Sequence, residues 1–296
     1  MIGKGQVLHM DKDILAVIAE ASPRFSKGQR NIAKYITENY DKAAFMTANK
    51  LGKAVNVSES TVVRFAAELG YNGYPEMRRA LQDMIRNCLT SVQRIEVAQD
   101  LLQSGDILTN VLNSDIEQIR LTMDDINRED FSRAADTIAN AKHIYILGVR
   151  SSAALANFMG FYFNLVFDNV RLVNEYSNSE VFEQVLRITK GDVFIALSFP
   201  RYSRRTIKAM RFARDMGASV IGITDTASSP IAKLADIALY ARSDMVSFLD
   251  SLVAPLSLVN ALVVAASSRA EGDLYKNFER LEHIWAEYEV YEKVDG

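Results

Sequence analysis

The chain has 296 residues, of which 49% are hydrophobic and 24% are charged, and its formal net charge is −3. At roughly 100–200 residues per domain, this length predicts two domains. The near-neutral charge excludes a basic coat spread over the whole surface, of the kind that binds polyanions without a defined site. The charge is unevenly distributed, because residues 1–90 carry a net charge of +4 and residues 91–296 a net charge of −7. Only the first part therefore suits a polyanion.

Composition also limits the chemistry. Cys88 is the only cysteine, which excludes an intrachain disulfide and a cysteine-rich zinc site and indicates a reducing, cytoplasmic setting. The three histidines lack metal-ligand spacing, so we expect no bound metal and no cofactor. The most apolar stretches, 153–167 and 252–266, are about 15 residues long, whereas a membrane span needs roughly 20. We therefore expect no membrane partner.

Up to about residue 84 the pattern indicates short helices, because Phe25, Ile32 and Ile36 recur at helical spacing and no stretch alternates as a strand does. Segment 47–70 has the features of a helix-turn-helix. These are a small residue where two helices cross, a turn residue that tolerates left-handed backbone, and apolar residues on the inner face of the second helix. The residues that supply them, in order, are Leu51, Gly52, Asn56, Val57, Val62 and Phe65.

The second helix of this motif is predicted to follow Ser58, a natural N-cap, and to bury the face that carries Val62 and Phe65. Its opposite face is small and polar with one arginine, which suits base edges in a major groove, and nearby cations suit phosphates. The predicted DNA-binding residues are Ser58, Ser60, Thr61 and Arg64 on this helix, and Lys50, Lys53, Arg78 and Arg79 for phosphates. The alternative is an ordinary three-helix bundle whose outer face is merely solvated.

Three runs in this region carry a family resemblance. They are Phe45-Met46-Thr47-Ala48, the stretch VSESTVVRF at 57–65 and the stretch LGYNGYP at 69–75. Together they resemble the N-terminal domain of the RpiR/MurR family of bacterial transcriptional regulators, and this combination is far more specific than a generic helix-turn-helix. The resemblance extends over about residues 22–270. It implies a C-terminal sugar isomerase (SIS) domain that senses phosphosugars.

The rest of the chain has a different pattern. We assign residues 1–86 to the helix-turn-helix domain, 87–112 to a partly helical linker, 113–272 to the SIS domain and 273–296 to a C-terminal amphipathic helix. Strands are predicted at 143–147, 170–173, 192–197, 219–224 and 236–240. Helices are predicted between them at 151–167, 179–188, 203–216 and 229–234. This alternation predicts an α/β doubly wound, parallel, five-stranded sheet. The SIS resemblance implies the flavodoxin-type strand order 2-1-3-4-5.

In that order a ligand crevice opens at the carboxyl ends of the first and third strands. The two loops there place hydroxyls and amides at helix starts, with arginines nearby, which is the chemistry that an anion requires. The predicted ligand-binding residues are Gly148, Ser151, Ser152, Ser198, Arg201, Ser203, Thr206 and Glu180, the last because it resembles a family segment that contacts the sugar. The alternatives are ordinary N-caps for the hydroxyls and an acid that interacts with the helix dipole for Glu180.

Both loops depart from the family pattern. SIS domains commonly have Gly-x-Gly-x-Ser after the first strand, and here Arg150 stands at the second glycine. They commonly have Ser-x-Ser-Gly-x-Thr after the third strand, whereas here extra residues that include Pro200 and Arg201 separate Ser198 from the following helix. We expect the longer loop to reshape the pocket for a phosphosugar or a related anion.

The family implies a regulator that binds double-stranded DNA at a palindromic operator as a homodimer or homotetramer. A sugar-phosphate isomerase with an attached helical domain is the alternative. Isomerisation needs a general base and usually a ring-opening acid, often Glu and His. His143 is predicted at the end of the sheet away from the crevice, and Glu180 alone is a thin catalytic set, so we expect no enzyme activity. A purely structural dimerisation module is the third possibility.

Overall fold

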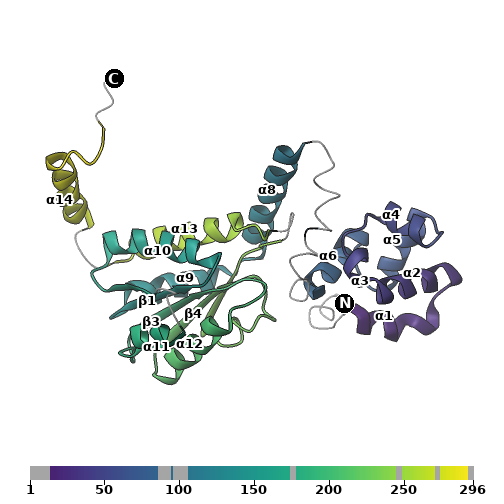
Figure 1. The fold of residues 1–296 in the computed structure, drawn as a ribbon, viewed down its shortest axis with the longest axis horizontal. Helices are drawn as coiled ribbons and strands as arrows, with labels where there is room; N and C mark the ends of the chain where they lie inside the picture. Colours follow the sequence, from purple (N-terminus) through teal and green to yellow (C-terminus); the bar gives the residue numbers. More distant parts are fainter. Residues whose placement is uncertain are drawn as a thin grey trace, which may run out of the picture. The chain divides into compact units, whose positions relative to one another are not determined.

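The computed structural model describes residues 14–85, 95, 106–173, 178–244, 249–270 and 274–292. The chain divides into two compact units, which meet in sequence between Ile107 and Leu108. One unit consists of helices, and the other contains a β-sheet with helices on both faces (Figure 1). The two-part architecture that the sequence predicts is therefore present.

The first unit is a helical bundle. Its described helices are α1 (Ile14–Ala21), the 3-10 helix η1 (Ser22–Arg24), α2 (Lys27–Glu38), α3 (Tyr40–Ala43), α4 (Ala48–Ala54), α5 (Glu59–Glu68) and α6 (Tyr74–Ile85). Ile32 and Ile36 of α2 are fully buried, and Phe25 contacts Phe65 of α5 with ring centroids 5.1 Å apart. Burying each such side chain stabilises the fold by about 2 kcal/mol. No strand occurs among the described residues of this unit, as the helical spacing predicts.

Helices α4 and α5 approach each other closely at Gly52. The amide of Val57 donates to the carbonyl oxygen of Gly52 at 2.9 Å, and a Cβ on Gly52 would lie only 2.8 Å from the carbonyl oxygen of Val57. Asn56 has a φ of 57°, a left-handed conformation that its short polar side chain tolerates. The predicted small residue and turn residue of the helix-turn-helix are confirmed at these positions.

Tyr74 ties the start of α6 to the segment before α4. Its hydroxyl donates to the carbonyl oxygen of Met46 at 2.9 Å, and burial raises the pKa of Tyr74 to about 12, although Arg78 opposes the change.

Because this folded-state pKa exceeds the ordinary value of 10.0, the stability that Tyr74 contributes is complete below pH 10.0 and is lost as the pH rises toward 12. Tyr74→Phe should remove this decline, which is on the order of 2 kcal/mol, in urea titrations across that range. An equal decline in the variant would assign the effect to other groups, such as Tyr145 and Tyr240, whose pKa values burial also raises.

The second unit is built on a five-stranded parallel sheet of order β2-β1-β3-β4-β5. Its strands are β1 (Ile144–Gly148), β2 (Val170–Leu172), β3 (Val193–Leu197), β4 (Ser219–Thr224) and β5 (Ile237–Tyr240). Its described helices are α8 (Ile107–Asp125), α9 (Arg128–Ala139), α10 (Ser152–Val166), α11 (Asn178–Val185), α12 (Arg204–Asp215), α13 (Val253–Ser267) and α14 (Leu274–Glu287). The predicted fold class and strand order are confirmed.

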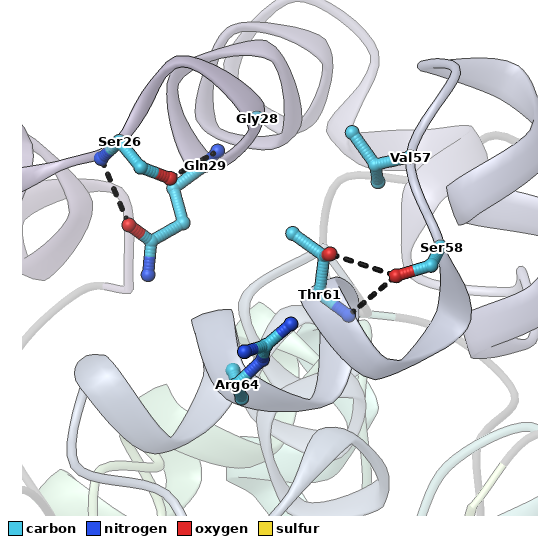
Figure 2. Close-up of a pocket in the computed structure, with 7 residues that line it drawn as sticks. All are labelled: Ser26, Gly28, Gln29, Val57, Ser58, Thr61 and Arg64. Carbon is cyan, nitrogen blue, oxygen red and sulfur yellow. Dashed lines mark hydrogen bonds between the residues drawn. The ribbon is translucent and has the colours of Figure 1, made fainter.

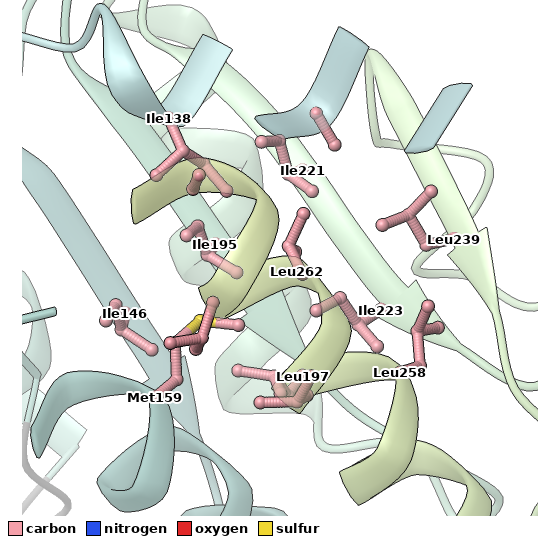
Figure 3. Packing of buried hydrophobic residues seen from close by; sticks show 14 of the residues in the cluster. Ile138, Ile146, Met159, Ile195, Leu197, Ile221, Ile223, Leu239, Leu258 and Leu262 are labelled. Atoms are coloured by element: carbon pink, nitrogen blue, oxygen red, sulfur yellow. The ribbon is translucent and has the colours of Figure 1, made fainter. Parts of the chain in front are cut away.

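Alternate residues of the strands face two different cores, because helices cover both faces of the sheet. Ile144 and Ile146 of β1 pack with residues of α9, α10 and α13, whereas Tyr145 and Leu147 pack with residues of α11 and α12. Figure 3 shows the first of these cores, where Met159 of α10 and side chains of α13 meet those of the strands. Both faces being buried explains why the strands read as continuous apolar runs in the sequence.

One predicted element is wrong. The segment 229–234, predicted as a helix, is a bend at Ser229 followed by turns. The residues from Asp225 to Asp236 join β4 to β5, and their polar groups form one local bond and one bond to β4. The Ser229 hydroxyl accepts from the amide of Ala232 at 3.0 Å, and the carboxylate of Asp236 accepts from the amide of Val220 at 2.8 Å. The Ser229 bond has the geometry of a helix N-cap, and the amide of Ala235 donates to the carbonyl oxygen of Ile231 at 3.1 Å, so about one helical turn forms before the chain enters β5.

Helix α8 fastens to the chain that follows β5. The side-chain amide of Gln118 accepts from the amide of Asp244 at 2.8 Å, and the Thr122 hydroxyl accepts from the amide of Arg242 at 2.9 Å. Both side chains are buried, so α8 belongs to the packed structure of this unit. Among the described residues, no helix combines the length and apolarity that crossing a membrane would require.

Candidate DNA-binding surface and effector site

Helix α5 begins at a cluster of hydroxyls. The Ser58 hydroxyl accepts from the amide of Thr61 at 3.3 Å, as expected of an N-cap, and its oxygen lies 2.9 Å from the Ser60 hydroxyl and 2.8 Å from the Thr61 hydroxyl. This cap satisfies one of the amides that a helix start leaves without a partner. The N-cap predicted at Ser58 is confirmed.

Helix α5 buries one face and exposes the other. Val62, Phe65 and Ala66 are fully buried, whereas Ser60 and Arg64 are exposed and Thr61 is half-buried. The same side chains that fix α5 in the bundle therefore leave a small polar face with one arginine outside. Such a face fits the width of a major groove.

The four predicted phosphate contacts differ in exposure. Lys50 and Lys53 of α4 and Arg79 of α6 are exposed, whereas Arg78 is half-buried. The Nε atom of Arg78 is buried and has no hydrogen-bond partner among the described residues. Lys50, Lys53 and Arg79 are thus placed on the surface, and Arg78 is placed partly inside the unit.

In the second unit, β1 ends where α10 begins. A Cβ on Gly148 would overlap the carbonyl oxygen of Ser152, so glycine is needed at this turn from strand to helix. Arg150, at the position where the family pattern has glycine, adopts the left-handed φ of 59°. Ser151 precedes α10 without making a side-chain cap, and Ser152 is buried in its first turn. The loop therefore keeps a glycine-like backbone although an arginine occupies the position.

The loop after β3 lies beside this turn, because Leu197 at the end of β3 pairs with Gly148 at the end of β1. The Ser198 hydroxyl accepts from the amide of Ser203 at 3.2 Å, and the Ser203 hydroxyl accepts from the amide of Thr206 at 3.3 Å, so Ser203 caps α12. These bonds bring Ser198, Ser203 and Thr206 together even though extra residues separate them in sequence. Arg201, within the extra residues, has a left-handed φ of 68°.

Thr206 is the most unusual of these residues. It is fully buried, and its side-chain oxygen has no hydrogen-bond partner among the described residues. Leaving a buried hydroxyl without a partner costs about 1–3 kcal/mol. A ligand oxygen that accepts a hydrogen bond there would remove this cost.

A polar network at the carboxyl ends of β3 and β4 was not predicted. The carboxylate of Asp225, which follows β4, accepts from the Tyr202 hydroxyl at 2.8 Å and from the Thr224 hydroxyl at 3.1 Å. Asp225 is buried, so this network holds the loop after β3 against the end of β4. The sequence signal that could have indicated it is an acidic residue directly after a buried strand, at the carboxyl edge of the sheet.

The remaining candidates lie elsewhere. The side chain of Glu180 is outside the described part of the structure, so its predicted role stays a prediction. His143 precedes β1 at the amino edge of the sheet, where its Nδ1 lies 2.9 Å from a carboxylate oxygen of the buried Asp192. It is therefore at the amino edge of the sheet, opposite to the edge where the crevice is predicted.

Known proteins match both units. Residues 12–87 match the helix-turn-helix domain of the rpiR family, and residues 137–265 match the SIS domain. An uncharacterised HTH-type transcriptional regulator of Caldanaerobacter subterraneus is 25% identical over 276 residues, which cover 92% of this chain and 96% of the relative. The HTH-type transcriptional regulator HexR of Pseudomonas aeruginosa is 25% identical over 280 residues, which cover 91% of this chain and 94% of the relative.

A solved structure agrees in fold. The NanR protein of Vibrio vulnificus, solved in complex with ManNAc-6P, has a TM-score of 0.57 and 22% identity, and the match covers 93% of this chain and 98% of NanR. The described bundle contains a helix-turn-helix, the sheet has the SIS strand order, and the similarity to named regulators extends over nearly the whole chain. The chain therefore belongs to the RpiR family of helix-turn-helix transcriptional regulators with a SIS domain.

Proposed function

We propose that the chain regulates genes of carbohydrate metabolism by binding a DNA operator with its first unit and a phosphosugar with its second. The observation that carries the effector part is the fully buried hydroxyl of Thr206, which has no partner in the described structure. It lies in the first turn of α12, where the helix dipole favours an anion. A phosphate oxygen that accepts from this hydroxyl would complete the site.

The other predicted ligand contacts surround that position. Ser198 and Ser203 are bonded to the same helix start, and Gly148 and Ser152 stand at the neighbouring strand end. Arg201 belongs to the adjoining loop and supplies positive charge to this edge of the sheet. We assign the phosphate to this group and the sugar to the space that the longer loop shapes. Ser151 and Glu180 complete the proposed contacts.

For DNA we propose that α5 enters a major groove. Its exposed Ser60 and Arg64 and the half-buried Thr61 would face the duplex, and Ser58 would lie at the entering end. Lys50, Lys53 and Arg79 would contact phosphates. Arg78 would contribute its charge from a partly buried position.

We propose that the active form is a homo-oligomer on a palindromic operator, with the recognition helices of two subunits about 34–36 Å apart. The second unit carries large exposed apolar side chains that suit subunit contacts, such as Phe161 of α10 and Val264 of α13, each 63% exposed. Effector binding would change the spacing of the two recognition helices and hence the affinity for the operator.

We propose that the site binds its ligand without converting it. In support, His143, a candidate ring-opening acid, lies at the opposite edge of the sheet and is bonded to Asp192. NMR spectra of sugar phosphates incubated with the purified protein should therefore stay unchanged. Conversion of any pentose or hexose phosphate would overturn this part of the proposal.

The effector is tested by a thermal-shift panel of sugar phosphates, their parent sugars and inorganic phosphate. At least one sugar phosphate should raise the melting temperature, because a ligand at 100 times its Kd adds about 2.7 kcal/mol of stability. The parent sugar should give a much smaller shift, since it lacks the group that Thr206 would bind. Equal shifts from a sugar phosphate and its parent sugar would contradict a phosphate site.

A further inference from the structure

A groove of the first unit lies between the starts of α2 and α5. Its volume is about 500 Å³ and it opens to solvent. The side of α2 contributes Ser26, Gly28 and Gln29, and the side of α5 contributes Val57, Ser58, Thr61 and Arg64. Figure 2 shows the two sets of side chains facing each other across the opening.

The lining suits an anion. It contains hydroxyls, an amide and one guanidinium, and no acidic side chain. The acid nearest in sequence, Glu59, accepts from the side-chain amide of Asn49 on α4 at 3.3 Å and is not part of the lining. Positive charge in the groove is therefore not neutralised by a carboxylate of the lining itself.

Arg64 is the cation of this groove. Its Nε donates to the carbonyl oxygen of Ser60, one turn earlier on α5, at 3.3 Å. This bond directs the side chain back toward the start of the helix, where the hydroxyls of Ser58 and Thr61 lie (Figure 2). Within the described part of the chain, Arg64 forms no ion pair, so its charge is available to a ligand.

The position of α2 relative to α5 is fixed by contact. A Cβ on Gly28 would lie 3.3 Å from a methyl group of Val57 and 3.5 Å from a methyl group of Thr61. The start of α2 must therefore accompany α5 wherever α5 binds. When a recognition helix lies in a major groove, the elements that flank it meet the sugar-phosphate backbone.

We infer that this groove seats a phosphate of the DNA backbone, with Arg64 as its charged ligand and the first turn of α2 as a second DNA-contacting element. The inference rests on the proposed binding of α5 in a major groove. It changes the expected role of Arg64 from reading a base edge to positioning the protein on the duplex. Ser26 and Gln29, which no motif singled out, then contribute to DNA affinity.

The test is a carboxylate placed in the groove without loss of the fold. Gln29 and Ser26 form a capping box, in which the Gln29 side chain accepts from the amide of Ser26 at 2.9 Å. Glutamate serves equally well at this position of a capping box and suits the helix dipole, so Gln29→Glu should fold normally. The matched control is Asn31→Glu, which adds the same charge to an exposed site on the opposite side of α2.

The DNA probes are a duplex enriched from a random pool by the wild-type protein and a scrambled duplex of equal length. Gln29→Glu should weaken binding to both about tenfold or more, whereas Asn31→Glu should change it less than about threefold. Equal affinities for the two variants would overturn the inference. If the wild-type protein enriches no duplex and binds none, the proposed function fails as well, and the two failures are thereby distinguished.

Arg64→Ala separates the two roles of the arginine. If Arg64 binds a phosphate, its replacement by alanine should weaken binding to the enriched and the scrambled duplex by similar factors. The magnitude of the slope of log K against log salt should then fall by about 0.9. If Arg64 instead contacts a base edge, the variant should lose affinity for the enriched duplex alone, and the salt slope should stay the same. That second outcome would contradict the inference and return Arg64 to the base edges.

Discussion

Replacing Thr206 by valine should abolish most of the thermal shift that a phosphosugar gives, and it should leave the unliganded protein at least as stable as before. The hydroxyl of Thr206 is fully buried and has no partner in the described structure, so the unliganded protein gains nothing from it. Valine has the same shape without the hydroxyl, and removing an unsatisfied buried group should raise the free energy of unfolding by about 1 kcal/mol. The bound phosphate would lose one charge-assisted hydrogen bond, which weakens affinity roughly 10- to 100-fold.

The matched control is Thr122→Val on α8, because the two threonines differ in how their hydroxyls are used. The Thr122 hydroxyl accepts from the amide of Arg242 at 2.9 Å, next to β5 and two strands away from β3. Its loss should destabilise the protein by about 1–3 kcal/mol and preserve the ligand-induced shift. Calorimetry of both variants, with and without ligand, measures the opposite changes in the stability of the unliganded protein and the size of the ligand-induced shift. A full shift in Thr206→Val would place the phosphate elsewhere in the crevice.

Features that depend on neighbouring residues could be predicted from the sequence. Ser58 caps α5 and Asn56 turns left-handed because each uses only residues a few positions away. The strand order is not such a local property. Its prediction came from the resemblance of the runs around 45–75 to a known family, and the structure confirms it.

Features that join distant segments could not be predicted. The first turn of α2 precedes α5 by about 30 residues, and nothing in the Ser26–Gln29 capping box indicates that Arg64 lies across from it. Likewise the Tyr202 hydroxyl reaches Asp225 only because β3 and β4 are neighbours in the sheet. The unpartnered state of Thr206 also depends on packing, since the sequence shows a threonine in the first turn of a helix and no more.

The predicted helix at 229–234 was wrong for a related reason. The residue pattern suits a helix, but the connection between β4 and β5 must begin and end at fixed positions of a parallel pair. Asp236 is held by the amide of Val220, at the start of the neighbouring strand. The tertiary contact therefore overrides the local preference, which is a weak determinant in short segments.

Gly52→Ala should destabilise the helix-turn-helix and lower affinity for the enriched duplex more than tenfold. Helix propensity alone predicts the reverse, because alanine stabilises a helix interior by about 1 kcal/mol relative to glycine. The added Cβ would, however, lie 2.8 Å from the carbonyl oxygen of Val57, a backbone atom that cannot turn aside as a side chain does. Separating α4 from α5 to relieve this contact should cost about 1–3 kcal/mol and tilt the exposed face of α5.

The neighbouring Ala54→Gly exchange provides the control, since it makes the opposite substitution at an exposed site of the same helix. Because Ala54 is the last residue of α4, the exchange should lower stability by less than about 1 kcal/mol and keep DNA affinity within about threefold. Hydrogen exchange of α4 and α5 in the full chain, together with DNA titrations, distinguishes the variants. If propensity governed this helix, Gly52→Ala would protect α4 and Ala54→Gly would expose it. If the close contact at Gly52 determines stability, the amides of α4 should exchange faster in both variants, and only Gly52→Ala should lose DNA affinity.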